Sequence, residues 1–248
     1  MRRTILFLVV ALCASAGAQP FPESDYERIL IPLLVPPARG AFGALFETSL
    51  TVSTKFPQTY VDVHGLRADC LLLTCTGPVE DSTTVGYENE GIPADKVHYD
   101  GTPGRFLYVR KDQLPNLYAH LRVRDTTRET FNLGTELPLV RSAQFAAERV
   151  FLRNDFPEDG YRSSLRIYAP QPTVVHMRLK GRNGRVDEHV LQLAAGATIY
   201  DPAFAYFGAF PERGWLTVTI DAETGPIWAF MTLTNNETQM ITLITPQP

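Results

Sequence analysis

The residues of this chain that could do chemistry are scattered. Five histidines are spread over 248 residues, and none lies at metal-ligand spacing from another. The sequence has no Gly-x-Ser-x-Gly turn, no His-Glu-x-x-His pair and no glycine-rich phosphate loop. We therefore expect a protein that is not an enzyme and that needs no cofactor.

One turn-rich stretch gathers aromatic side chains that could bind a ligand. Its members are Tyr200, Phe204, Tyr206, Phe207, Phe210 and Trp215. Aromatic faces stack on sugar rings and anchor protein partners, but large exposed apolar patches are rare. The stretch is therefore either a binding surface or a part of the interior, at one end of a core or at a junction between domains.

A second, polar loop is a weak candidate for a cation site. Its candidate ligands are Asp155, Glu158 and Asp159. Calcium takes about six to eight oxygen ligands, and these side chains supply only part of that number. A simple turn is the favoured interpretation, so we expect no bound metal.

The pair Cys70 and Cys75 is a candidate disulfide. Residues five apart in an extended strand lie about 16 Å apart, whereas a disulfide needs Cα atoms within about 7 Å. A bond therefore requires residues 71–74 to turn, and an oxidising compartment would favour it. The alternative is two free thiols on a straight apolar strand. A redox-active pair is not expected, because the Cys-x-x-Cys spacing is missing.

Residues 1–18 have the pattern of a secretory signal peptide. Arg2 and Arg3 precede an apolar run, and the small residues 16–18 favour cleavage before Gln19. The apolar run is too short to cross about 30 Å of hydrocarbon. We expect export to the periplasm or the cell exterior and no membrane span in the mature chain.

The mature chain is expected to be mildly acidic. The whole sequence has 23 Lys and Arg against 27 Asp and Glu, and removal of residues 1–18 takes away two arginines and no acid. Proteins that bind nucleic acid present clustered basic surfaces. We therefore expect no nucleic acid partner and favour an unidentified protein or glycan.

Alternation of apolar and polar residues predicts β-strands. Leu216, Val218 and Ile220 alternate with Trp215, Thr217 and Thr219, and residues 117–124 follow the same pattern. A period of two is typical of strands with one buried face. With frequent turn residues between such runs, the sequence predicts an all-β sandwich or barrel.

The two halves of the chain share a strand plan. Residues 49–52 (Ser-Leu-Thr-Val) recur as residues 164–167 (Ser-Leu-Arg-Ile), and residues 117–125 align without a gap with residues 227–235. Such self-similarity predicts two copies of one structural unit.

A domain division follows from this repeat, because residues 136–140 also echo residues 30–34. We expect a signal peptide over 1–18, a first β-sandwich domain over 19–135 and a second over 136–248. The chain has no Gly/Ser-rich spacer at this boundary, so a stiff connection is expected.

Both copies are similar to a known kind of module. Residues 31–35 and 48–52 resemble the opening of immunoglobulin-like modules in secreted bacterial proteins of unassigned function, and residues 137–140 and 161–167 look similar. The resemblance implies two tandem immunoglobulin-like β-sandwich domains, and it transfers no catalytic residue.

These features favour an exported, non-enzymatic binding or structural module of the cell envelope or extracellular space. One alternative is a secreted hydrolase with carboxylates at the domain junction, which a deep cleft with convergent carboxylates would favour. The other is a chaperone-like two-domain periplasmic protein, which an unpaired apolar edge strand near the interdomain bend would favour.

Intact-mass spectrometry of the exported protein tests the signal peptide and the disulfide together. We expect a chain that begins at Gln19 and whose mass is lower by two hydrogens than that of the same chain after reduction. A mass that reduction leaves unchanged would show that Cys70 and Cys75 are free thiols.

Overall fold

The computed structural model describes nine stretches of the chain. These are residues 21–33, 37–65, 82–87, 92–93, 105–128, 134–156, 160–181, 184–193 and 214–246. Within them the chain is almost entirely β, with short 3-10 turns and no α-helix, so the prediction of an all-β protein is confirmed. No helix in these stretches is long and apolar enough to cross a membrane. Residues 1–18 lie outside them, and the signal peptide stays a prediction.

The strands form four small antiparallel sheets, which we name after their first long strands. Their bounds are β1 (Tyr26–Ile31), β2 (Ala38–Arg39), β3 (Leu45–Thr54), β4 (Val61–His64), β5 (Ser82–Val85), β6 (Ile92–Pro93), β7 (Arg105–Arg110), β8 (Leu117–Asp125), β9 (Thr135–Leu137), β10 (Val140–Arg141), β11 (Arg149–Phe156), β12 (Tyr161–Tyr168), β13 (Thr173–Gly181), β14 (Val186–Leu193), β15 (Gly214–Ala222), β16 (Trp228–Asn235) and β17 (Ile241–Ile244).

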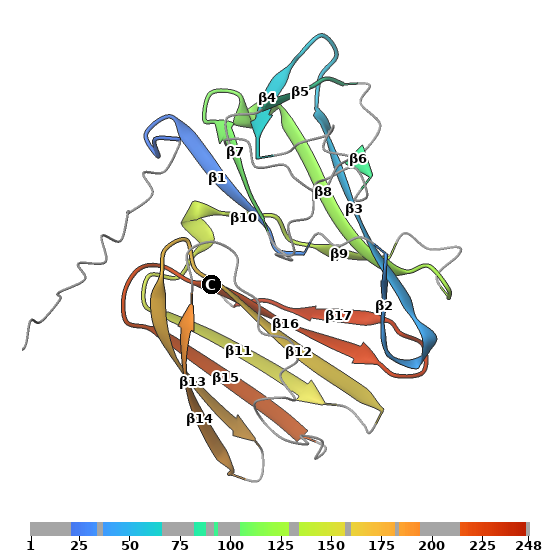
Figure 1. The fold of residues 1–248 in the computed structure, drawn as a ribbon, viewed down its shortest axis with the longest axis vertical. Helices are drawn as coiled ribbons and strands as arrows, with labels where there is room; N and C mark the ends of the chain where they lie inside the picture. Colours follow the sequence, from blue (N-terminus) through green and yellow to red (C-terminus); the bar gives the residue numbers. More distant parts are fainter. Residues whose placement is uncertain are drawn as a thin grey trace, which may run out of the picture.

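Each sheet has a simple strand order. The β1 sheet is ordered β10-β1-β7-β4-β5, and the β3 sheet is ordered β2-β3-β8-β9 with β6 also beside β3. The β11 sheet is ordered β11-β15-β13-β14, and the β12 sheet is ordered β12-β16-β17. Figure 1 shows the four sheets following one another in a propeller-like ring. That they are two immunoglobulin-like sandwiches remains a prediction.

The sequence repeat reappears in the pairing of the strands. In the β3–β8 ladder Leu50 lies opposite Leu121, and in the β12–β16 ladder Leu165 lies opposite Met231. Leu165 and Met231 are the residues that the repeat aligns with Leu50 and Leu121. A slip of one residue would turn every side chain to the other face. The aligned blocks therefore pair in the same register.

The order of strands is repeated as well. If the short β2, β6 and β10 are set aside, each half supplies seven described strands in chain order. The β1 and β11 sheets both place the first, fifth, third and fourth of these side by side. The β3 and β12 sheets both place the second, sixth and seventh side by side.

One aligned segment does not follow the predicted scheme. Residues 136–140 were expected to open the second copy as residues 30–34 open the first. Instead β9 lies beside β8, as β17 lies beside β16, and β10 pairs with β1. The opening strand of the second half is β11, which pairs with β15 as β1 pairs with β7. The boundary near residue 135 stays a prediction.

Two apolar clusters fill the interior. The first joins the β1 and β3 sheets through residues such as Leu107 and Leu121. The second joins the β11 and β12 sheets through residues such as Leu152 and Ile167. These side chains are almost completely removed from water.

The β12 sheet is buried on both of its faces near the Trp228 end of β16. Ile167, Ala229 and Met231 belong to the second cluster, whereas Tyr168, Trp228 and Phe230 belong to the first. Successive residues of a strand point to opposite faces, so the two sets lie on opposite sides of the sheet. The Tyr168 hydroxyl donates a hydrogen bond to the Pro32 carbonyl. The outer face of the second half thus packs against the first half.

Phe230 provides a test of this interface. Its side chain is fully buried and stacks on the Tyr168 ring, with centroids 6.3 Å apart. Phe230→Ala should lower the free energy of unfolding by about 3–5 kcal/mol in denaturant titrations. The matched control is Phe151→Ala on β11, where the ring is 46% exposed, and the cost should stay below about 1 kcal/mol. Equal losses in the two variants would contradict this account of the interface.

Candidate functional site

A cavity of about 460 Å³ lies between the two halves. Cavities that hold small ligands commonly measure about 300–1,000 Å³. The first half contributes one wall through the β2–β3 hairpin and nearby apolar residues, and the β12 sheet contributes the other. The lining residues are Leu33, Ala38, Arg39, Gly40, Ala41, Phe46, Val123, Arg162, Ser163, Ser164, Arg166, Thr232, Thr234 and Ile241.

The β12 wall is polar because the outer face of the sheet changes character along the strand. Arg162, Ser164 and Arg166 precede Tyr168 at every second position, so all four lie on the same face. Thr232 lies opposite Ser164 on β16, and their hydroxyl oxygens are 2.7 Å apart. The face therefore continues from the apolar interface into a cavity wall of arginines and hydroxyls.

Arg162 is held in place by neutral groups. Its Nη1 donates to Asn236 Oδ1 at 2.9 Å, and its Nη2 donates to Gln239 Oε1 at 2.6 Å. The guanidinium carbon lies 5.8 Å from the centroid of the Phe42 ring. Burial lowers the pKa of Arg162, and the nearby positive charge of Arg128 lowers it further. The amide partners thus orient a cation without neutralising it.

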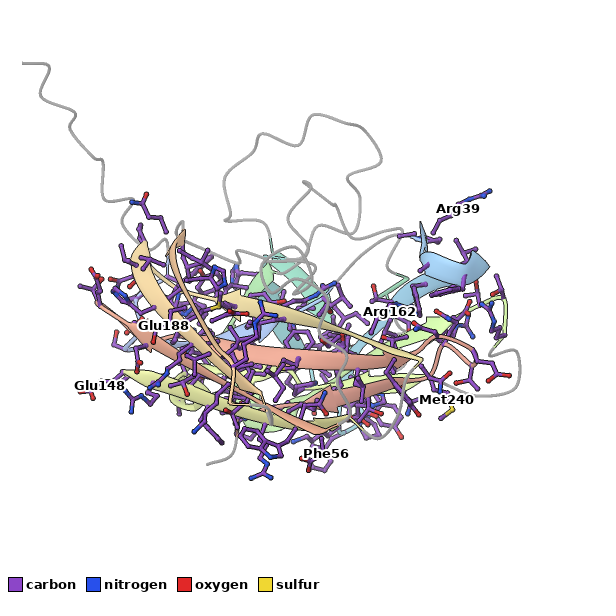
Figure 2. The ribbon with its side chains drawn as sticks, turned by 90° about the horizontal axis from the view of Figure 1, so that it is seen from below. Arg39, Phe56, Glu148, Arg162, Glu188 and Met240 are labelled. Carbon is purple, nitrogen blue, oxygen red and sulfur yellow. The ribbon has the colours of Figure 1, made fainter. Side chains whose placement is uncertain are left out.

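The described lining of the cavity carries positive charge only. Arg39, Arg162 and Arg166 contribute three guanidinium groups, and no Asp or Glu is among the lining residues. In Figure 2 Arg39 extends outward from the molecule, whereas Arg162 lies within its outline. Arg39 is exposed, which puts it at the rim. The cavity is therefore a candidate site for an anion.

The opposite wall is shaped by the β2–β3 hairpin. A Cβ atom at Gly40 would lie 2.5 Å from the Phe46 ring, so a glycine is needed for that ring to pack there. Phe42 has a φ of 55°, a left-handed conformation that non-glycine residues adopt at some cost. This turn carries the ring over which Arg162 lies.

Asp125 holds the hairpin to the end of β8. Its buried carboxylate accepts hydrogen bonds from the Leu45 amide at 3.0 Å and from the Thr127 hydroxyl at 2.6 Å. Arg128 Nη1 donates to it at 2.8 Å, and Arg128 Nη2 donates to the Phe42 carbonyl at 2.6 Å. Burial alone would raise the pKa of Asp125, but these hydrogen bonds outweigh burial and lower the pKa to about 2.

Asp125→Asn tests this link. Because the carboxylate has a lowered pKa in the folded state, its stabilisation is full above about pH 4 and is lost as the pH falls towards 2. The variant should lose about 2 kcal/mol of unfolding free energy at neutral pH, and urea titrations should show the difference shrinking below about pH 4.

The matched control is Asp112→Asn. Asp112 is an exposed carboxylate that also pairs with an arginine, at 2.8 Å from Arg110. Water screens such pairs, so little change in stability is expected. A difference between Asp125→Asn and the wild type that does not depend on pH would contradict the role given to the ionised carboxylate.

Most of the predicted aromatic site lies outside the described residues. Tyr200, Phe204, Tyr206, Phe207 and Phe210 all do, and only Trp215 falls within them. Trp215 is half-buried on β15, and the Arg153 guanidinium carbon lies 5.6 Å from its ring centroid. Whether the stretch is core or binding surface is still a matter of prediction.

The other predicted site residues are similarly placed. Asp155 is exposed on β11, 3.7 Å from the Arg153 Nε, whereas Glu158 and Asp159 lie outside the described residues. Cys70 and Cys75 also lie outside them, so the disulfide stays a prediction. Among the residues that the structure describes, no three His, Cys, Asp or Glu side chains gather closely enough to hold a metal ion.

Sequence reasoning missed the basic cavity, although a signal for it was present. The repeat aligns Tyr168, Trp228 and Phe230 with Ser53, Tyr118 and His120. The second copy thus has apolar residues on the strand face where the first copy is mainly polar. That difference marks a face covered by other residues, and the arginines further along the same face mark the edge of the covered region.

No protein-family model, curated protein or solved structure matches this chain.

Proposed function

We propose that this protein is an exported, non-enzymatic binding module of the cell envelope or extracellular space. Two immunoglobulin-like sandwiches are packed together, and a ligand binds in the cavity between them. The observation that carries this proposal is a cavity of about 460 Å³ with walls from both halves. The packed outer face of the β12 sheet keeps those walls in a fixed relation.

The strand order supports the immunoglobulin-like assignment. In an immunoglobulin constant domain, strands B, E and D lie side by side in one sheet, and C, F and G in the other. The first, fifth and third strands of each half are neighbours, and so are the second, sixth and seventh. The fourth strand is an addition at the sheet edge. The β10 strand lies beside β1, where strand A would lie beside strand B.

The chemistry of the cavity favours binding over hydrolysis. A glycosidase needs a pair of carboxylic acids beside the bond that it cleaves. The described cavity lining has neither Asp nor Glu, and it has no histidine to serve as a base for Ser163 or Ser164. The hydrolase alternative therefore draws no support from this cavity.

A chaperone-like two-domain periplasmic protein is the second candidate. Among the described strands β12 pairs with β16 alone, so it lies at the edge of its sheet and borders the junction. A peptide could add a strand at such an edge. Ligand binding that protects the backbone amides of β12 from hydrogen exchange, and that is insensitive to changes in the cavity side chains, would favour this candidate.

Thermal unfolding with a library of small neutral, cationic and anionic compounds tests the main proposal. At least one compound should raise the midpoint of the wild type by several degrees, because a ligand at about 100 times its Kd stabilises a folded protein by about 3 kcal/mol. The effect should be lost in Ala38→Trp and Ala41→Trp, which place a bulky ring at exposed positions of the cavity wall.

The control for these variants is Val190→Trp on β14. Val190 is 62% exposed and is not part of the cavity lining. This variant should respond to the library as the wild type does. Equal shifts in the wild type and in both cavity variants would overturn the proposal, because the compounds would then bind elsewhere.

A further inference from the structure

We infer that the ligand of this cavity is an amphipathic organic anion, with one carboxylate or phosphate group at Arg162 and an apolar body against the first half. This inference rests on the proposed function and adds the chemical class of the ligand.

Arg162 carries the argument for the anionic group. A guanidinium has about five N–H donors, and Asn236 and Gln239 accept two hydrogen bonds from Arg162. Donors are therefore left over for a ligand, and their planar fork matches the two oxygens of a carboxylate or phosphate. Both acceptors are neutral amides, so they leave the positive charge of this guanidinium uncompensated.

The surroundings of Arg162 strengthen this preference. Arg166 lies on the same face of β12 and adds a second cation, although it has interactions of its own. Asp125 and Arg128 already form an ion pair with each other at 2.8 Å. Opposite charges attract more strongly where protein walls exclude water. An anion would therefore be favoured here although the chain as a whole is acidic.

The apolar half of the same cavity argues for an apolar body. Leu33, Phe46, Val123 and Ile241 line it, and all four also pack in the first apolar cluster. Inorganic phosphate alone would leave this surface in contact with water. A ligand that covers it would gain about 25 cal/mol for each Å² of apolar surface removed from water.

The Ser164 and Thr232 hydroxyls complete the polar side. They lie 2.7 Å apart, and each hydroxyl has one proton and two acceptor lone pairs. One of them donates to the other, so the remaining proton is available to a ligand oxygen. The polar wall thus carries hydroxyl donors as well as guanidinium donors.

Calorimetric titration with matched probes tests the inference. The probes are carboxylates from butanoate to decanoate, the corresponding alkyl phosphates, and alcohols and ammonium ions with the same alkyl chains. The anions should bind at least about tenfold more tightly than alcohols of equal length, and affinity should fall as salt is raised. The ammonium ions should bind most weakly.

Substitutions of single arginines test which positive charge binds the anionic group. Arg162→Gln should weaken binding of the carboxylates by about tenfold or more and leave binding of the alcohols unchanged. Arg166→Gln removes the second cation of the cavity and should have a smaller effect in the same direction. Arg162→Lys keeps the charge without the fork and should have an intermediate effect. The matched control is Arg178→Gln, which removes an exposed arginine on β13 outside the cavity lining and should bind like the wild type.

The possible failures can be told apart. If alcohols or ammonium ions bind as tightly as the anions, and Ala38→Trp abolishes that binding, the cavity is a ligand site but the inferred ligand class is wrong. If Ala38→Trp and Ala41→Trp leave all binding unchanged, the site itself is wrong. If no probe binds, or if Arg162→Gln, folded by circular dichroism, binds the carboxylates like the wild type, the inference is overturned.

Discussion

The arrangement of the two halves depends on burial of the outer face of the β12 sheet. Tyr168, Trp228 and Phe230 on that face join the first apolar cluster, while Ile167, Ala229 and Met231 on the other face join the second. A sheet that is apolar on both faces must be covered on both. The cavity lies where the apolar part of this face ends and Arg166, Ser164 and Arg162 follow.

Alternating apolar residues and the internal repeat were the sequence features from which the architecture could be predicted. The match of residues 49–52 and 117–125 to the second half predicted that these segments play the same part in both halves. The β3–β8 and β12–β16 ladders share one register, because register is determined by which face is apolar. Residues 136–140 resemble residues 30–34 in sequence, but β9 and β10 do not take the place in the second half that β1 takes in the first. Short apolar segments around a proline are too common to distinguish an opening strand from the closing strand β9.

The set of residues that lines the cavity could not be assembled from a sequence motif, for a physical reason. Arg162 and Ser164 come from β12, Phe46 comes from the β2–β3 hairpin, and Val123 comes from β8. No motif joins residues so distant in sequence, because only the packing of the halves brings them together. A search for catalytic spacings also favours carboxylates and histidines, whereas this site is made of arginines, hydroxyls and apolar side chains.

The contact between the halves also determines whether copies of the chain can form fibres through it. It is heterologous, since the outer face of one unit meets a different surface of the other, and such contacts can build open filaments when every unit presents both surfaces. The β3 sheet carries Ser53, Tyr118 and His120 where the β12 sheet carries its apolar residues. The first half therefore lacks the apolar face that a further unit would need for this contact. The contact can form once, between the two halves, and does not extend into a filament.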